Sequence, residues 1–347
     1  MQPAFHQRQL QSYASVMTAA VARAADGWRP GEVRNVHDDM MGVTMAIVAE
    51  TLFGADVSTD TADVGHAIAQ LMDDFASILG IAARFQPPAW VPTPVNRRLR
   101  VSSRKLDQLV LRMIEQRRRR ADGDGGEDLL ALLLRARDED GTTMTDTQVR
   151  DEAVTLFLAG HETTALVLTY ALYLLAANPE TQARLADEIE RVLSGRAPAL
   201  GDLEALTYTD GVVLESMRLY PPAWAIAREA TRDVEIGGFA FRKGAELVAS
   251  PYVVHRDPTN FPEPESFQPT RWENDLARRL PRFAYLPFGG GPRGCIGNRF
   301  AMMEAKLVLA SLVQRFRFET TPETKVRLSA SVTLRPRGGV QLRLAAR

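Results

Sequence analysis

Cysteine and lysine are scarce in this 347-residue chain, which contains one cysteine, Cys295, and four lysines. A single thiol cannot form an internal disulfide, so a secreted scaffold held together by disulfides is excluded. Long apolar runs are also missing. No stretch reaches the length of a membrane span, and the first residues lack the apolar core of a signal peptide. These absences predict a cytoplasmic protein without a membrane anchor.

Net charge is small as well. The formal charge at pH 7 is −1, with 45% hydrophobic and 24% charged residues, as in an ordinary globular protein. Such a balance gives no bulk electrostatic attraction to nucleic acid. The length allows one large domain or two average ones. Because neither an internal repeat nor a linker is evident, we expect residues 1–347 to form one domain.

Apolar residues at three- and four-residue spacing predict helices in the first half of the chain. These helices are expected over residues 9–25, 36–53, 61–79 and 95–120. Thr145-Asp-Thr-Gln148 is a capping box, and a helical pattern of 33 residues then runs to Ala177. A helix of about 50 Å that is apolar on several faces should pass through the middle of the molecule.

Further helices are expected over residues 179–193 and 208–219, and from Asn298 onward. Strand patterns appear only late in the chain. They predict a hairpin that turns at Gly237-Gly238, and strands over residues 246–249, 325–334 and 339–344. The predicted fold class is therefore mainly α with a small β portion.

Cys295 lies in the glycine-rich segment Phe288-Gly-Gly-Gly-Pro-Arg-Gly-Cys-Ile-Gly297. A lone cysteine is usually a small buried hydrophobe. Here, however, unhindered glycine backbone would let a flat ligand approach closely. The helix expected from Asn298 also places the sulfur near a helix N-terminus, which favours the metal-binding thiolate. Zinc and iron–sulfur sites need several ligands, so a single axial bond to haem iron fits this loop better.

The pattern Phe288-x-x-Gly291-x-Arg293-x-Cys295-x-Gly297 resembles the haem-binding loop of the cytochrome P-450 monooxygenases. The resemblance covers nearly the whole chain. It implies the cytochrome P-450 fold with one long central helix, and haem b bound through Cys295, Phe288 and Gly289. It also implies an N-terminal truncation, because the first strands and helices of that fold have no counterpart here. A haem-binding remnant without activity is therefore an alternative.

Ala159-Gly-His-Glu-Thr-Thr164 lies in the middle of the long expected helix. Glycine costs about 1 kcal/mol relative to alanine there, and threonine hydroxyls compete for backbone hydrogen bonds, so a local kink is one interpretation. The resemblance implies another, an oxygen-activation motif. Ala159 and Gly160 would then make room beside the iron, and Glu162 and Thr163 would form a proton relay.

Glu215-Ser-Met-Arg218 places opposite charges three residues apart on one helix face. Such a pair is usually a weak surface salt bridge. Together with Arg271, however, it resembles the buried Glu-Arg-Arg network of the family. The resemblance implies that Glu215, Arg218 and Arg271 hold the loop that carries the cysteine, a structural role and not a catalytic one.

Arginine binds carboxylates bidentately, which makes it the candidate for the haem propionates. The resemblance assigns that role to Arg228 and Arg293. It also implies that residues 223–226 line the substrate pocket. His255 is either another neighbour of the propionates or a structural histidine. His161 is expected to be a groove or packing residue and not a second iron ligand.

The activity implied by the resemblance is insertion of one oxygen atom of O2 into an apolar small molecule, such as a fatty acid, terpene or polyketide. A thiolate ligand favours cleavage of the O–O bond. The chain shows no flavin or ferredoxin module, so a separate ferredoxin or flavodoxin type donor is expected to supply the electrons. Arg282 and Arg299 would form part of its docking face.

Gly289-x-Gly291-x-x-Gly294 also matches a dinucleotide-binding fingerprint. The apolar residues 283–286 would be the preceding strand, and Glu319 would contact the ribose. Pro287 and Pro292 argue against this reading because they crowd the turn between strand and helix. The chain also ends too soon for further alternating strands and helices.

Overall fold

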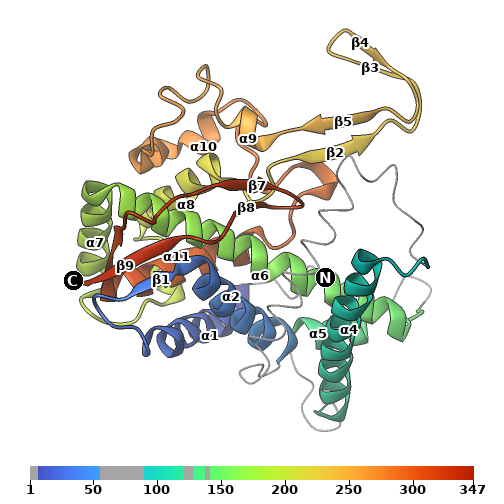
Figure 1. Ribbon diagram of the computed structural model, residues 1–347, viewed down its shortest axis with the longest axis horizontal. Coiled ribbons are helices and arrows are strands. Elements are labelled where there is room, and N and C mark those ends of the chain that lie inside the picture. Colours follow the sequence, from blue (N-terminus) through green and yellow to red (C-terminus); the bar gives the residue numbers. More distant parts are fainter. Residues whose placement is uncertain (1–6, 55–89, 121–127, 137–140) are drawn as a thin grey trace.

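The computed structural model describes residues 7–54, 90–120, 128–136 and 141–347 (Figure 1). Its helices and 3-10 turns are α1 (Gln7–Ala25), α2 (Val36–Phe53), α4 (Pro94–Arg120), α5 (Leu129–Arg135), α6 (Asp146–Ala177), α7 (Pro179–Leu193), η3 (Leu200–Asp202), α8 (Thr207–Leu219), α9 (Pro251–Val254), η4 (Pro269–Asp275), α10 (Leu276–Arg279), η5 (Gly291–Arg293) and α11 (Asn298–Arg315). Its strands are β1 (Val33–Asn35), β2 (Ile226–Glu229), β3 (Val234–Ile236), β4 (Phe239–Phe241), β5 (Glu246–Ala249), β6 (Phe316–Thr320), β7 (Leu328–Ala330), β8 (Leu334–Pro336) and β9 (Gln341–Ala346). The predicted helix over residues 61–79 lies outside the described residues.

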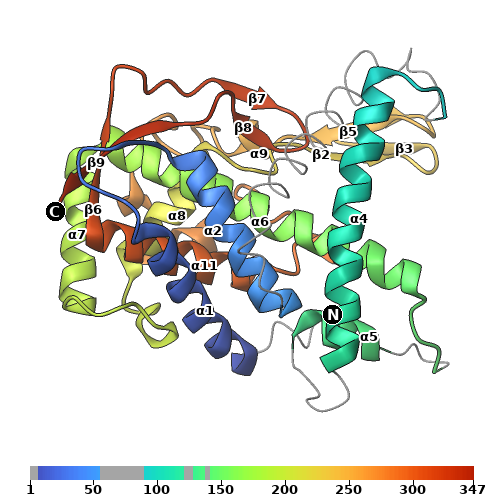
Figure 2. The same ribbon diagram turned by 60° about the horizontal axis from the view of Figure 1, so that its bottom comes forward.

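The long helix α6 is the central element of the fold. It begins at the predicted capping box, where the Gln148 amide donates to Thr145 Oγ1 (3.3 Å) and the Thr145 amide donates to Gln148 Oε1 (2.8 Å). It runs for 32 residues, about 48 Å. Helices α2, α4, α8 and α11 all pack against it (Figures 1 and 2). The predicted passage of one long helix through the molecule is confirmed.

One apolar core joins the N-terminal and C-terminal parts of the chain. Its buried side chains include Met17 of α1, Val48 of α2, Leu168 of α6, Val308 of α11 and Leu344 of β9. In Figure 2, α1, α2 and α11 lie together on one side of α6. The core thus forms between the helices, and the strands cover its edges.

The strands form small antiparallel sheets. β9 lies between β1 and β6, while β2 pairs with β5, β3 with β4 and β7 with β8. The hairpin of β3 and β4 turns at Gly237-Gly238 as predicted. β2 was not predicted, because the short, largely polar segment Ile226–Glu229 has too few apolar positions to show an alternating pattern.

Two expectations about strands were wrong. Residues 325–334 do not form one strand, since β7 and β8 fold back on each other around residues 331–333. No glycine or proline marks that turn in the sequence. Residues 283–286 form turns, and every strand pair in the described ranges is antiparallel. The dinucleotide-binding alternative needs a parallel sheet and is therefore excluded.

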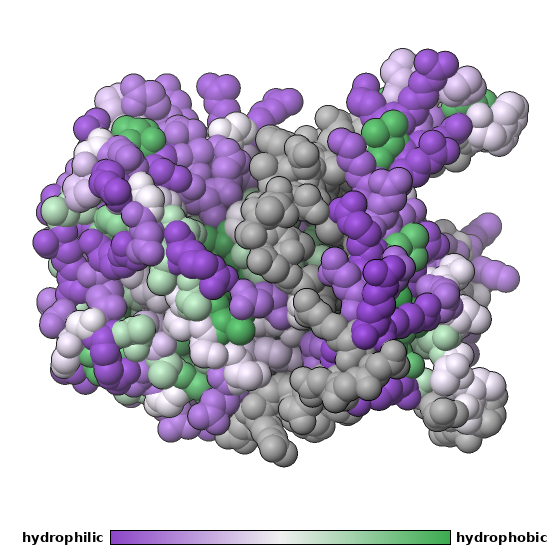
Figure 3. All heavy atoms as spheres, turned by 90° about the horizontal axis from the view of Figure 1, so that it is seen from below, coloured by the Kyte–Doolittle hydropathy of each residue, from purple (hydrophilic) through white to green (hydrophobic). Residues whose placement is uncertain are grey.

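The face shown in Figure 3 is covered mostly by hydrophilic residues, with small separate hydrophobic spots. None of the helices in the described part of the chain is long and apolar enough to cross a membrane.

Candidate active site

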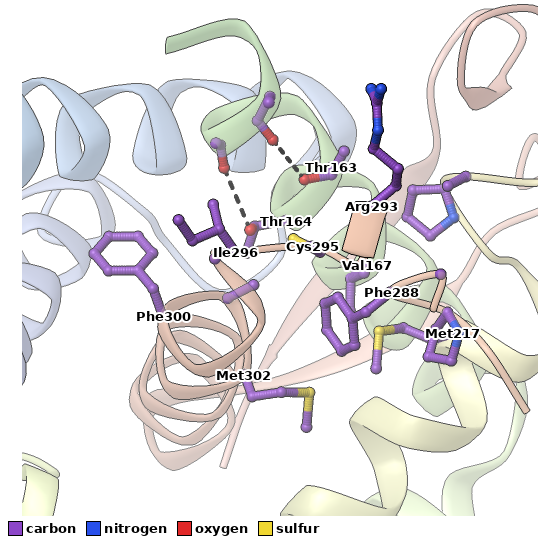
Figure 4. A pocket seen from close by; sticks show the side chains of 18 of the residues that line it. Thr163, Thr164, Val167, Met217, Phe288, Arg293, Cys295, Ile296, Phe300 and Met302 are labelled. Carbon is purple, nitrogen blue, oxygen red and sulfur yellow. Dashed lines mark hydrogen bonds between the residues drawn. The ribbon is translucent and has the colours of Figure 1, made fainter. Parts of the chain in front are cut away.

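A cavity of about 780 Å³ lies between α6, α8, β2 and the glycine-rich loop before α11 (Figure 4). Its lining is mostly apolar and includes Leu52, Leu156, Val167, Met217, Phe300 and Met302. Ala223 and Ile226, expected near a substrate, also line it. A volume of this size accommodates a small organic ligand, and the lining favours an apolar one.

Cys295 opens into this cavity from the glycine-rich loop. Its amide donates to the Phe288 carbonyl (2.9 Å), so the loop folds back on itself and brings Phe288 to the same cavity. Gly289 and Gly291 both have a φ of +68°, a conformation that other residues rarely adopt. The local sequence therefore sets the loop shape that turns Cys295 toward the cavity.

The thiol of Cys295 has a raised pKa in the polypeptide alone. Burial raises the pKa, and a hydrogen bond from the Gly297 backbone offsets this only in part. The expected contribution of the helix start in favour of the thiolate is therefore present at Gly297 but smaller than that of burial. A metal ion at the sulfur would supply the missing stabilisation, because coordination deprotonates a thiol.

The described residues contain no cluster of three or more His, Cys, Asp or Glu side chains that could hold a metal ion by themselves. Within the described ranges, a metal at Cys295 would therefore have to bring most of its own ligands. An iron ion inside a porphyrin does so, and it needs only one axial ligand from the protein.

Helix α6 forms the wall that faces the cysteine loop, with Ala159, Gly160, Thr163 and Thr164 lining the cavity. The Thr163 hydroxyl donates to the Ala159 carbonyl (2.8 Å), and the helix is continuous here (Figure 4). A Cβ on Gly160 would lie 3.2 Å from Val48 Cγ2. This glycine thus allows α2 to approach α6 closely.

Glu162 does not line the cavity. Its buried carboxylate turns toward the C-terminal hairpin, where Oε1 accepts hydrogen bonds from Thr333 Oγ1 (2.5 Å) and Arg335 Nε (2.6 Å). Burial raises the pKa of Glu162, but the hydrogen bond and charge of Arg335 outweigh this and leave the pKa below its ordinary value. The structure does not join Glu162 to Thr163, because Thr163 bonds to its own helix.

Thr333 and Arg335 were not among the residues predicted for the site. Both lie more than 170 positions from Glu162 in the chain, and no motif surrounds them. Only the return of β8 to α6 brings them to this carboxylate.

The two histidines near the site are structural. His161 is buried and its Nδ1 contacts the Phe157 carbonyl at 2.9 Å, while burial lowers its pKa. His255 is also buried, and its Nε2 accepts a hydrogen bond from the Leu286 amide (2.9 Å). Burial lowers the pKa of His255 to about 4. Since His255 is not part of the cavity lining, the structural interpretation holds and the propionate interpretation does not.

Glu215, Arg218 and Arg271 meet in a buried network. The Arg218 guanidinium donates to both carboxylate oxygens of Glu215 (2.9 and 2.8 Å), and Arg271 Nε donates to Oε1 (3.2 Å). Two donors were missed by sequence reasoning, the Gln268 amide and the Trp272 indole (3.1 and 2.8 Å). The carboxylate is therefore fully satisfied.

This network reaches the cysteine loop through intermediate residues. Arg218 donates to the carbonyl of His255 (3.0 Å), whose ring accepts from the Leu286 amide. The Tyr285 hydroxyl donates to the Leu214 carbonyl (2.8 Å) beside Glu215. Tyr285 and Leu286 directly precede the glycine-rich loop, so the start of that loop is anchored to α8.

Arg228 of β2 and Arg293 of η5 line the cavity and are exposed. Two guanidinium groups at an apolar cavity suit a ligand with an apolar body and two carboxylates. Haem has that form. With Cys295 opening into the same cavity, the residues present fit a haem.

A family model for cytochrome P450 matches residues 1–343. The chain belongs to the cytochrome P450 family. As a member of this family it is a monooxygenase-type enzyme whose cofactor is haem b. The predictions of family, fold class and cofactor are therefore confirmed.

Several bacterial P450 relatives cover almost the whole chain. Cyclooctatin synthase of Streptomyces melanosporofaciens is 39% identical over 339 residues, 96% of this chain and 72% of the relative. Cyclooctat-9-en-7-ol 5-monooxygenase of the same organism is 37% identical over 93% of this chain and 70% of its own length. Pentalenene oxygenase of Streptomyces avermitilis is 36% identical over 100% of this chain and 76% of its own length.

Proposed function

We propose that this P450 inserts one oxygen atom of O2 into a terpenoid, with electrons from a separate donor protein. The observation that carries the proposal is Cys295, which opens into an apolar cavity whose facing wall contains Thr163. We take residues 1–347 to act as one domain. The apolar core shared by α1, α6 and β9 supports this view.

Each part of the cavity has a proposed role in holding the cofactor. Cys295 would bind the haem iron, and Arg228 and Arg293 would pair with the propionates. Gly289 and Phe288 would lie against one side of the cofactor, with Ala159 and Gly160 of α6 on the other. Haem with a thiolate ligand supplies the activation of O2, and the protein supplies orientation and protons.

Thr163 and Glu162 are the proposed proton donors of this site. The Thr163 hydroxyl already donates its hydrogen to the Ala159 carbonyl, so its oxygen lone pairs remain available to accept a second hydrogen bond from the cavity side. Glu162 follows directly before it in the helix, but its carboxylate is bound to Arg335 and Thr333. Proton delivery by Glu162 therefore requires its side chain to leave these partners.

A terpenoid is the proposed substrate among the three apolar classes expected. The names of two relatives refer to pentalenene and to cyclooctat-9-en-7-ol, an alkene and an alkenol with few polar groups. The apolar side chains of Leu156, Val167 and Met217 in the cavity suit such a compound. Its binding should displace water from the cavity and need few hydrogen bonds.

An acidic ferredoxin or flavodoxin is the proposed electron donor. Arg282, Arg293 and Arg299 are all exposed around the cysteine loop. Complementary charge mainly accelerates association, so replacing Arg282 and Arg299 by glutamate should slow reduction most at low salt. A reduction rate that is unchanged at low salt would remove these two residues from the docking face.

The absorption spectrum of the purified chain, reduced and treated with carbon monoxide, tests the core of this proposal. A Soret band strongly shifted to the red is expected for haem bound through a thiolate. Cys295→Ser should abolish that band. A chain without haem, or a band that survives the substitution, would contradict the proposed role of Cys295.

The substrate class has a test of its own. Addition of cyclic terpene alkenes and alkenols should shift the Soret band, whereas fatty acids of equal carbon number serve as the comparison. A shift by fatty acids alone would contradict the terpenoid assignment but leave the monooxygenase assignment intact.

A further inference from the structure

Helix α4 is far more basic than the rest of the chain. Its 27 residues include ten arginines and lysines and two acidic residues, whereas the whole chain has a net charge of −1. Positive charge is therefore concentrated on one element, and the remainder of the protein carries a net negative charge. An anionic surface would attract α4 and repel the remainder, which orients the molecule on that surface.

The two sides of α4 differ in burial. On the inner side, Leu106, Val110 and Met113 are buried where the helix packs against α6. Figures 1 and 2 show α4 on the outside of the molecule, next to the N-terminal part of α6. The outer side carries four exposed residues at helical spacing, here called the α4 face: Arg97, Val101, Arg104 and Lys105.

The charge of the α4 face is not compensated by its neighbours. Near the C-terminal end of α4, Arg117 pairs with Asp128 and Arg118 pairs with Asp146. None of the three cations of the α4 face forms an ion pair with another residue in the part of the chain that the structure describes. These cations are therefore available to an external anion.

Apolar side chains accompany this charge. Val101 is 54% exposed and lies between Arg97 and Lys105 on the helix surface. Trp90 is 78% exposed and precedes the start of α4 by four residues. Tryptophan, with its apolar rings and polar N–H group, favours the boundary between lipid and water. An anionic partner that also accepts apolar groups fits both features.

We propose that the α4 face docks this protein on the surface of an anionic phospholipid bilayer. The guanidinium groups of Arg97 and Arg104 would bind lipid phosphates bidentately, and Lys105 would add a point charge. Val101 and Trp90 would reach below the headgroups. Clusters of basic residues on an amphipathic helix bind anionic lipid in this way without crossing the bilayer. Duplex nucleic acid offers the charge but no apolar layer.

Docking would bring the cavity close to a reservoir of its substrate. An apolar terpenoid partitions from water into a bilayer. The ion pair of Asp107 with Arg150 (3.2 Å) connects α4 to α6, and Leu156 of α6 lines the cavity. Only this benefit rests on the proposed function, because docking itself needs neither haem nor substrate.

Sedimentation with lipid vesicles tests the docking. The purified chain should sediment at low salt with vesicles of phosphatidylglycerol and phosphatidylcholine in equal parts, and much less with phosphatidylcholine alone. Its bound fraction should fall steeply as salt is added. Absence of binding to the anionic vesicles would overturn the proposal.

Charge reversal locates the docking surface. The triple variant Arg97→Glu, Arg104→Glu, Lys105→Glu should lower the partition coefficient at least about a hundredfold. The matched control is Arg232→Glu, Arg242→Glu, Lys243→Glu, which changes the net charge equally at exposed residues around the β3–β4 hairpin. Equal losses in the two triple variants would mean that net charge and not the α4 face drives binding. The double variant Arg104→Gln, Lys105→Gln should show an intermediate loss.

The apolar contribution has its own readout. Tryptophan emission should shift to the blue when anionic vesicles are added, and this shift should be absent in Trp90→Phe. Val101→Ser should weaken binding a few-fold, by the same factor at low and high salt, because the lost contact is apolar. Unshifted emission in the wild type together with full binding of Val101→Ser would overturn insertion below the headgroups.

Two competitors distinguish a bilayer from other sources of phosphate. At constant ionic strength, inorganic phosphate should not displace the chain from vesicles, and duplex DNA at equal phosphate concentration should bind it more weakly than vesicles do. Displacement by phosphate would indicate a site for the free ion, and equal binding of DNA would indicate a general polyanion site. Either result would overturn the bilayer assignment. A chain that lacks the red-shifted carbon monoxide band but still binds vesicles contradicts only the proposed function.

Discussion

Glu215 and Glu162 are both buried carboxylates bound to arginine, yet their surroundings differ. Both oxygens of Glu215 accept hydrogen bonds, from Arg218, Arg271, the Gln268 amide and the Trp272 indole. The two hydrogen bonds that the described residues make to Glu162 both go to Oε1. Among the described residues, partners bind both oxygens of Glu215, whereas those of Glu162 bind one oxygen.

This difference separates a structural group from one that can move. A fully satisfied buried network rigidifies its surroundings, because moving any member strands the others. The Glu215 network therefore suits the anchoring of the chain before the cysteine loop. Glu162 would give up two hydrogen bonds to described residues on leaving them, which is compatible with the movement proposed for it.

The largest predicted effect is that of Glu215→Gln. It leaves the Arg218 guanidinium buried, at 0% exposure, without its counter-charge. We expect a loss of about 3–5 kcal/mol in the free energy of unfolding. Denaturant titration measures this loss, with Glu273→Gln as the control, since the ion pair of Glu273 with Arg184 is exposed. Equal stability of both variants would contradict the structural role of Glu215.

Glu162→Gln should lower the free energy of unfolding less than Glu215→Gln does, by about 1.5–3 kcal/mol at pH 7. The reason is that two hydrogen bonds to a charged oxygen are weakened. The pKa of Glu162 lies below its ordinary value, so ionised Glu162 stabilises the fold above pH 4.5. That contribution is lost as the pH falls through the lowered pKa. The difference between wild type and Glu162→Gln in denaturant titrations should therefore vanish in acid.

The neighbouring His161 titrates in the same experiment and also contributes to the pH dependence of stability. Burial lowers the pKa of His161, so the wild type and the variant both lose stability as the pH falls below about 6.5. The charge of Glu162 raises the pKa of His161, so this contribution differs between the two proteins and the comparison is made with both carrying His161→Asn. A difference that grows in acid would mean that Arg335 does not hold Glu162 in its ionised form.

Smaller effects are expected from replacing one glycine near each of the two carboxylates. On Gly211 of α8, a Cβ would lie 2.7 Å from the carbonyl oxygen of Pro269, a backbone atom of η4. Gly211→Ala should therefore push η4, which carries Arg271 and Trp272, away from Glu215. We expect the free energy of unfolding to fall by about 1–3 kcal/mol, as measured by thermal unfolding. An unchanged melting temperature would show that η4 adjusts freely.

Gly160→Ala, in the region of Glu162, should have the smallest effect. The closest atom to the added methyl group is Val48 Cγ2 at 3.2 Å, the tip of a side chain, and alanine favours the helix over glycine by about 1 kcal/mol. We expect a net change within about 1 kcal/mol in the same thermal measurement. A loss as large as that of Gly211→Ala would mean that α2 cannot move at all.

The residues of the sequence that carry local signals were read correctly. The capping box at Thr145 marks the start of α6, apolar residues mark α2 and α7, and the glycines around Cys295 mark a loop with positive φ angles at Gly289 and Gly291. These features depend on neighbours in the chain, because helix periodicity, caps and tight turns are determined within a few residues.

The tertiary structure decided which distant groups meet. Thr333 and Arg335 reach Glu162 only because β7 and β8 fold back toward α6, and Trp272 reaches Glu215 only because η4 packs on α8. The residues next to a side chain in the sequence do not indicate a partner that lies fifty or more positions away. The sequence by itself therefore determined the family and the helices, whereas packing decided how each buried carboxylate is held.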